Sequence, residues 1–264
     1  MDKMVKPVKH ILLSSKDKQY LNIRKQEGKS DTLEEQPQNY KKKVVIKPWG
    51  YEFLMFENNS VAIWFLHINK DHSTSMHCHP LKKTSLTLLS GQALCNTFRH
   101  RNFLIAGDAL VIDPAVFHST KALSLDGISL IEVETPPAKL DLVRLEDNYG
   151  RKNYGYEGFS KMITDNLETF NYLYFEENSC SKQKVVVNNK YSISMETYSD
   201  DQTFQQLFSI DPGALYCVCK GDLLKSDNSK VVATGETERG GYLRQINGLS
   251  INSMTVLMKF SIFE

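Results

Sequence analysis

A chain of 264 residues is long enough for one large domain or two of ordinary size. Its 32 basic and 31 acidic side chains give a formal net charge of +1, so no single-sign field points to nucleic acid or an anionic membrane as a partner. No apolar run approaches the roughly 18 residues needed to span a bilayer, and the early run at residues 11–13 is too short for a signal peptide. We therefore expect a cytoplasmic protein.

The first 44 residues are polar and rich in lysine, with only a brief apolar stretch at residues 8–13. They predict an N-terminal arm, which can exchange onto a partner subunit. Short apolar or alternating runs then follow at residues 61–68, 86–89, 102–105, 109–112 and 128–133. Such evenly spaced runs of Val, Ile, Phe and Thr are typical of a sandwich or small barrel, which we place at residues 45–150.

Residues 151–180 interrupt this pattern and predict a connection with a helix around residues 162–172. Strand-like runs resume at residues 184–187 and 192–197, and predict a second barrel over residues 181–264. At an offset of 130, residues 61–71 align with 191–201 and residues 86–94 with 216–224, and Gly91 falls on Gly221. We interpret this internal similarity as a duplicated barrel.

The five cysteines form an odd set without the even framework of a small secreted domain, which favours free thiols in a reducing compartment. Cys217 and Cys219 have the spacing of metal ligands, but no second Cys or His cluster lies near them in the sequence. On an alternating strand they are more simply two core thiols.

All seven histidines lie in the first half of the chain, and His77 and His79 are two residues apart. On a strand such residues project to the same face, so both imidazoles can reach one ion, and His118 supplies a third ligand from another strand. The simpler alternative is that these rings only fill a barrel that binds no ion. The second barrel cannot repeat the site, because at the offset of 130 the two histidines fall on Leu207 and Ser209.

These residues resemble the two motifs of the cupin superfamily. The first motif reads His-x-His, three or four residues, Glu, six residues, Gly, and here runs from His77 to Gly91. The second reads Gly-Asp, an apolar strand, Pro, His, and here runs from Gly107 to His118. The resemblance implies an all-β fold, a double-stranded β-helix (cupin or jelly-roll) barrel. Together with the internal similarity at an offset of 130, it predicts a bicupin whose second barrel is degenerate.

Thr84 stands where cupins usually place a glutamate ligand. The set is therefore three histidines without a carboxylate, unless Glu132, Glu134 or water completes it. Neutral imidazoles suit one divalent transition metal, Zn, Fe, Mn, Ni or Co, and the missing anion leaves the ion more Lewis acidic.

Two flanking segments, KPWGYE at residues 47–52 and RLEDNYGR at residues 144–151, resemble the flanks of mannose-6-phosphate isomerase type cupins of polysaccharide biosynthesis. The resemblance covers about residues 45–151. The motif of that family often reads Ser-Leu-Gln-x-His with a later Glu. Here His77 replaces the Gln and Thr84 the Glu, which puts the parent activity in doubt.

A sugar-phosphate site also needs cations and a base. We expect cations at the barrel mouth to bind a phosphate, either Lys82 and Lys83 beside the first motif or Arg144 and Arg151 after the last strand. Thr84 lies beside Lys83 in the expected substrate site. Glu132 shares one strand face with Glu134 and is the candidate catalytic base.

We therefore expect a metal-dependent isomerase or epimerase that acts on a phosphorylated or nucleotide-linked sugar in surface-polysaccharide synthesis. The alternatives are an Fe(II) three-histidine dioxygenase and a non-catalytic sugar-binding cupin. The resemblance also implies a homodimer, because cupin barrels commonly pair through sheet edges and arms.

Overall fold

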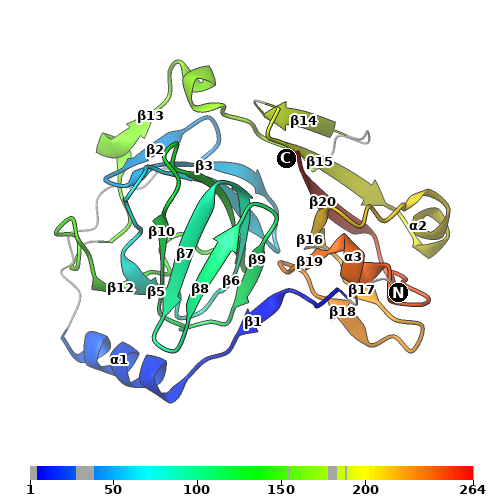
Figure 1. Cartoon of the computed structure of the whole chain (residues 1–264), viewed down its shortest axis with the longest axis horizontal. Helices are drawn as coiled ribbons and strands as arrows, with labels where there is room; N and C mark the ends of the chain where they lie inside the picture. The colour runs from blue at the N-terminus through cyan, green and yellow to red at the C-terminus, as the bar shows by residue number, and fades with distance from the viewer. Residues whose placement is uncertain (1–4, 28–38, 154, 178–182, 188, 264) are drawn as a thin grey trace.

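The computed structural model describes residues 5–27, 39–153, 155–177, 183–187 and 189–263. Eight consecutive strands of this chain are divided between two facing sheets, four in each (Figure 1). They are β4 (Ala62–Ile68), β5 (Met76–Cys78), β6 (Lys83–Ser90), β7 (Gln92–Thr97), β8 (Arg101–Ile105), β9 (Ala109–Ile112), β10 (His118–Ala122) and β11 (Ile128–Thr135). One sheet has the order β9-β6-β11-β4 and the other β5-β10-β7-β8, with all neighbours antiparallel. This is a jelly roll, so the predicted all-β double-stranded β-helix class is confirmed.

Further strands extend both sheets. On the larger sheet, β3 (Gly50–Glu57), β2 (Val44–Lys47) and β13 (Met162–Ile163) follow β4, and β1 (Lys9–Ile11) runs parallel to β9 at the opposite edge. On the smaller sheet, β12 (Val143–Glu146) pairs with β5.

The predicted arm packs on its own barrel. It contains β1 and a helix, α1 (Ser15–Gln26). A capping box between Ser14 and Asp17 stabilises the start of this helix. The Asp17 carboxylate also accepts a hydrogen bond from the Phe117 backbone N–H at 2.9 Å. Leu21 of the same helix packs with Phe117 and Cys78. The arm therefore supports the strand that carries His118.

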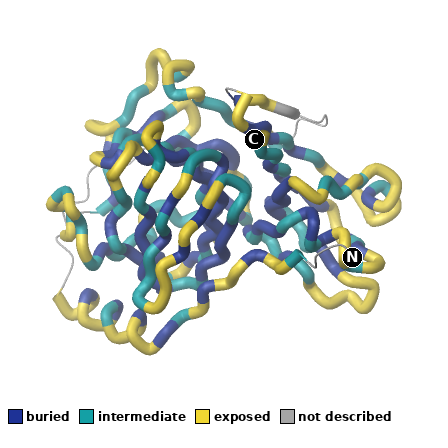
Figure 2. Tube along the Cα trace, viewed as in Figure 1, coloured by how far each residue is buried: buried dark blue, intermediate teal, exposed yellow. Residues whose placement is uncertain are grey.

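The larger sheet is buried on both faces, as Figure 2 shows by the dark blue of its central strands. Its inner face, with Trp64 and Leu86, packs inside the jelly roll. Its outer face, with Phe65 and Ile131, packs against apolar residues of the C-terminal part such as Phe260. Burial on both faces explains the nearly continuous apolar runs in this part of the sequence.

The C-terminal part repeats the order of the larger sheet. It contains β14 (Gln183–Val187), β15 (Tyr191–Tyr198), α2 (Asp201–Leu207), β16 (Leu215–Lys220), β17 (Leu223–Leu224), β18 (Lys230–Val232), β19 (Thr237–Arg239), α3 (Gly240–Leu243) and β20 (Thr255–Ile262). The order β14-β15-β20-β16-β19 corresponds to β3-β4-β11-β6-β9, and the β17-β18 hairpin to β7-β8. Gly91 and Gly221 both have positive φ in equivalent turns. These correspondences support the interpretation of a duplicated fold.

The second facing sheet is reduced in this C-terminal part. Leu207, which aligns with His77, ends helix α2 rather than lying on a strand. Cys217 and Cys219 are free and fully buried, as expected for core thiols.

The helix predicted around residues 162–172 is absent from this described stretch. Two short 3-10 helices, η1 (Phe159–Lys161) and η2 (Leu167–Phe170), flank β13 instead. Asn166 and Asn171 have left-handed φ values, which interrupt a continuous α-helix. Among the described residues, no helix is long and apolar enough to cross a membrane.

The turn at Gly235 connects the C-terminal part to the jelly roll. Ser85 Oγ donates a hydrogen bond to the Gly235 carbonyl at 2.7 Å. Gly235 has a φ of +82°, and a Cβ atom there would lie 1.7 Å from Thr135 Oγ1. Gly235→Ala is therefore expected to lower the free energy of unfolding by about 2–4 kcal/mol, measured by urea denaturation. Gly213→Ala, at an exposed position with ordinary contacts, is the control, and an equal loss in both variants would contradict the prediction.

Candidate metal centre

The structure brings the three predicted histidine ligands together. His77 lies on β5, His79 follows that strand, and His118 begins β10 directly opposite His77 in the antiparallel register. One ring nitrogen from each lies within 4.8 Å of the other two, and all three residues are buried. Two neighbouring strands of the smaller sheet thus hold three imidazoles at one place inside the jelly roll.

Each imidazole is oriented by a backbone carbonyl. The Nδ1 atoms of His77, His79 and His118 lie 2.8, 2.7 and 3.0 Å from the carbonyl oxygens of Ser75, Asp141 and Val116. A carbonyl can only accept, so Nδ1 carries the proton in each ring and Nε2 keeps its lone pair. Metal-ligating histidines are commonly held in this way.

The rings are also kept neutral. Burial, followed by the neighbouring His118, lowers the pKa of His77, and burial lowers the pKa of His118 to about 4. Burial, followed by the nearby Lys82, lowers the pKa of His79 in the same direction. Near pH 7 all three can therefore act as lone-pair donors.

These residues fit a divalent transition metal. Among the described residues, the buried Nε2 atoms of His79 and His118 have no hydrogen-bond partner, which is costly unless a ligand satisfies them. A single ion among the three rings satisfies both. Thr84 is buried opposite Glu134 on β11 and brings no carboxylate to the site, so the metal group consists of the three histidines.

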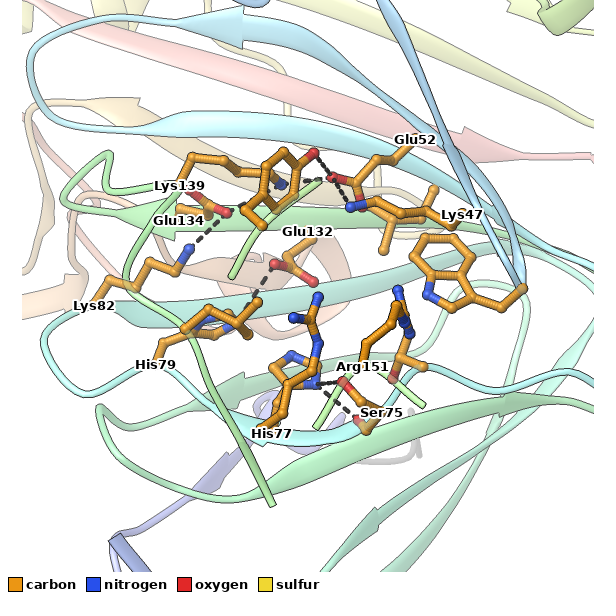
Figure 3. A pocket seen from close by; sticks show the side chains of 16 residues that line it. Lys47, Glu52, Ser75, His77, His79, Lys82, Glu132, Glu134, Lys139 and Arg151 are labelled. Atoms are coloured by element: carbon orange, nitrogen blue, oxygen red, sulfur yellow. Dashed lines mark hydrogen bonds and ion pairs between the residues drawn. The ribbon is translucent and has the colours of Figure 1, made fainter. Parts of the chain in front are cut away.

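A pocket opens beside the histidines and encloses about 460 Å³ between its atoms, mouth included. Figure 3 shows Glu132 pointing into it, and Glu132 Oε1 lies 3.7 Å from His79 Nε2. Glu132 stands outside the group of mutually close ligand atoms. It is therefore placed to act beside a bound ion.

Glu132 differs electrostatically from the other carboxyl groups of the pocket. Within the described chain, no ammonium or guanidinium group lies at ion-pair distance from it, and burial raises its pKa to about 7. Burial also favours a higher pKa for Glu134, but the ammonium groups of Lys82 and Lys139 outweigh it. The pKa of Glu134 is therefore lowered overall. Two carboxyls on one strand face thus titrate differently, a feature of acid–base sites.

The cations around the pocket are held in ion pairs. Lys82 pairs with Glu134 at 2.7 Å, and Lys139 pairs with Glu52 at 2.8 Å. The other three cations form four pairs: Lys47 with Glu157, Arg144 with Glu157, and Arg151 with both Asp147 and Glu157. These ion pairs form a polar wall of the pocket that also contains the histidines.

The predicted substrate-binding residues are only partly brought to the pocket. Arg144 and Arg151 line it. Lys83 does not, because its side chain points to the outer face of the sheet and pairs with Glu236 of the C-terminal part. Thr84 points inward but is not among the lining residues. Neighbouring strand residues face opposite sides, so an inward Thr84 already implied an outward Lys83.

Several lining residues were not assigned a role from the sequence: Lys47, Trp49, Glu52, Lys139 and Tyr156. The first three belong to the KPWGYE segment, so that segment was the available signal. No sequence pattern marks Lys139 or Tyr156, which reach the pocket from loops.

Lys82 and Lys83 form a matched pair for mutation. Lys82→Met removes a fully buried partner of Glu134 and is expected to lower the free energy of unfolding by about 2–4 kcal/mol, because a buried charge loses its closest counter-ion. Lys83→Met is expected to change it by less than about 1 kcal/mol, since this pair is partly exposed. Urea denaturation measures both, and a larger loss for Lys83→Met would contradict the placement.

Searches with protein-family models and among curated proteins give no match for this chain. Its structural neighbours include cupins. A cupin 2 conserved barrel domain protein from Leptotrichia buccalis is 12% identical, with 80% of this chain and 88% of that chain covered and a TM-score of 0.31. KdgF from Halomonas sp. is 16% identical, with 35% and 85% covered and a TM-score of 0.34. A cupin superfamily sugar phosphate isomerase from Silicibacter pomeroyi is 9% identical, with 34% and 59% covered and a TM-score of 0.31.

These likenesses concern the fold, and one fold hosts many chemistries. The chemistry of this chain therefore depends on the residues of its own site.

Proposed function

We propose that this protein is a metal-dependent isomerase or epimerase that acts on a phosphorylated or nucleotide-linked sugar in surface-polysaccharide synthesis. The observation that carries the proposal is the position of the buried carboxyl of Glu132, 3.7 Å from His79 Nε2; burial raises its pKa to about 7 in the metal-free protein. A base with a pKa near the working pH, next to a metal site, is what proton transfer beside a carbonyl requires.

The site geometry supports separate roles for the metal ion and for Glu132. His77, His79 and His118 would hold a divalent ion, which would supply the Lewis acidity needed to polarise a sugar carbonyl. The Glu132 carboxylate takes the proton from the carbon next to that carbonyl. It returns the proton to the neighbouring carbon in an isomerase, whereas in an epimerase the same carbon is reprotonated on its other face.

The charge balance favours an anionic substrate. Five cationic side chains line the pocket, and five carboxyls line it or pair with these cations: Lys47, Lys82, Lys139, Arg144 and Arg151 against Glu52, Glu132, Glu134, Asp147 and Glu157. The formal charges cancel, and three neutral imidazoles add none. A divalent ion therefore leaves the site positive, which an anionic sugar phosphate compensates.

Solvent exchange tests the proposal. Metal-loaded protein is incubated in D₂O with sugar phosphates and nucleotide sugars, and proton NMR follows deuterium entering the carbon next to the carbonyl. Exchange is expected with the wild type and with Glu146→Gln, an exposed control, but not with Glu132→Gln. The absence of exchange with every substrate, or equal exchange in Glu132→Gln, would count against the proposal.

The absence of a carboxylate from the histidine group supports a second candidate, an Fe(II) dioxygenase. Three neutral ligands leave coordination positions for a substrate and oxygen. Oxygen uptake by the iron-loaded protein, with small thiols and hydroxy acids as substrates, would favour this candidate. Tight sugar-phosphate binding without exchange or oxygen uptake would instead indicate a non-catalytic sugar-binding protein.

A further inference from the structure

The three histidines differ in where their orienting carbonyls come from. His77 and His118 use the carbonyls of Ser75 and Val116, each two residues earlier in the same segment. His79 uses the carbonyl of Asp141, which lies 62 residues away in the chain. The orientation of His79 therefore depends on a tertiary contact, whereas that of the other two is local.

Asp141 is fastened to the turn that follows His79. Its carboxylate oxygen Oδ2 accepts the backbone N–H groups of Leu81 and Lys82 at 2.8 and 3.1 Å. The Lys82 ammonium donates to the Ala138 carbonyl at 3.1 Å, and Asp141 N–H donates to the same carbonyl at 2.9 Å. These bonds join the loop at residues 138–142 to the turn at residues 79–82.

We propose that Asp141 is the positioning residue that holds His79 in its metal-binding orientation. The carboxylate fixes the loop against the turn, and the carbonyl keeps the proton on His79 Nδ1, so that Nε2 faces the site. The same loop carries Lys139 and Leu142, which line the pocket, so Asp141 also ties the pocket wall to a ligand. This inference rests on the proposed metal site.

Variants at Asp141 separate positioning from general stability. Asp141→Ala removes the carboxylate but keeps the carbonyl, and is expected to weaken Co(II) binding about 10- to 100-fold and to alter the visible Co(II) spectrum. Asp141→Asn keeps one oxygen that can accept both N–H groups, so it is expected to restore both properties. Asp126→Ala, which removes an exposed carboxylate from a turn between β10 and β11, is the control and is expected to match the wild type.

The metal-free protein gives a second measurement. Imidazole ¹H–¹⁵N spectra report the protonated nitrogen of each ring, and in Asp141→Ala only His79 is expected to lose its single Nδ1–H form. If the alanine variant does not fold, Asp141→Glu carries the test, because it keeps the charge but displaces the oxygen, and a partial loss is expected.

The outcomes separate this inference from the proposed function. Unchanged Co(II) affinity and spectrum in Asp141→Ala, or an equal loss of the Nδ1–H form in all three histidines, would overturn the role of Asp141. A wild type that binds no Co(II) would overturn the metal-dependent function, while the imidazole spectra would still decide whether Asp141 orients His79.

Discussion

Replacing His118 with alanine is expected to abolish tight metal binding. The variant keeps two of three converging Nε2 ligands, and two neutral imidazoles alone bind a divalent ion weakly. We expect the metal dissociation constant to rise by at least about 100-fold, measured by competition with a chelator and by metal analysis of the purified protein. His72→Ala, at an exposed position outside the group, is the control.

Thermal unfolding gives an independent measure of the same effect. A ligand that binds only the folded state adds about 2.7 kcal/mol of stability at 100 times its dissociation constant. Added metal is therefore expected to raise the Tm of the wild type and of His72→Ala but not of His118→Ala. One tightly bound ion per chain in His118→Ala would show that the three histidines do not form the site.

Glu132→Gln is expected to have the largest effect on turnover. The amide cannot accept the substrate proton, so exchange into the substrate is expected to fall about 10²- to 10⁴-fold. The amide has nearly the same shape, so substrate binding is expected to change much less. Initial rates at saturating and at low substrate concentration separate the two effects, and a loss confined to KM would assign Glu132 to binding rather than proton transfer.

The same substitution has a defined effect on the stability of the metal-free protein. Glu132 has a pKa of about 7 in the folded state, above its ordinary value of 4.5, so the folded protein holds a proton that the unfolded chain releases between these values. The protonated Glu132 side chain therefore contributes fully to the stability of the folded protein below about pH 4.5, and this contribution is lost as the pH rises through 7. Glu132→Gln removes this loss, and is expected to be about 1–3 kcal/mol more stable than the wild type at pH 8 but similar at pH 4.5.

Urea denaturation of both proteins across this pH range measures the difference. Parallel stability profiles would show that the Glu132 pKa is not raised. Removal of an ion-paired carboxyl, as in Glu134→Gln, is expected to act in the opposite direction, because the Lys82 and Lys139 ammonium groups lower the Glu134 pKa.

The sequence by itself determined most of the jelly-roll strands and the candidate metal ligands. Apolar runs such as residues 109–112 and 128–133 coincide with β9 and β11, because a buried strand imposes its pattern on consecutive side chains. The spacing of His77 and His79 determined that both rings share a face, for the same period-two reason. The resemblance of residues 107–118 to the second cupin motif then pointed to His118 as the third residue of the group.

Only the tertiary structure decided what surrounds these histidines. Lys82 rather than Lys83 reaches the pocket, and Lys139 and Asp141 come to it from a loop whose path no periodicity describes. The sequence pattern also cannot distinguish the pKa shifts of Glu132 and Glu134, because both side chains face the same side of one strand. Each pKa depends on which cations, distant in the sequence, lie within a few ångströms in the fold. Strand periodicity depends only on neighbouring residues, so it can be predicted from the sequence. The pKa values and the orientation of the ligands depend on contacts between segments far apart in the chain.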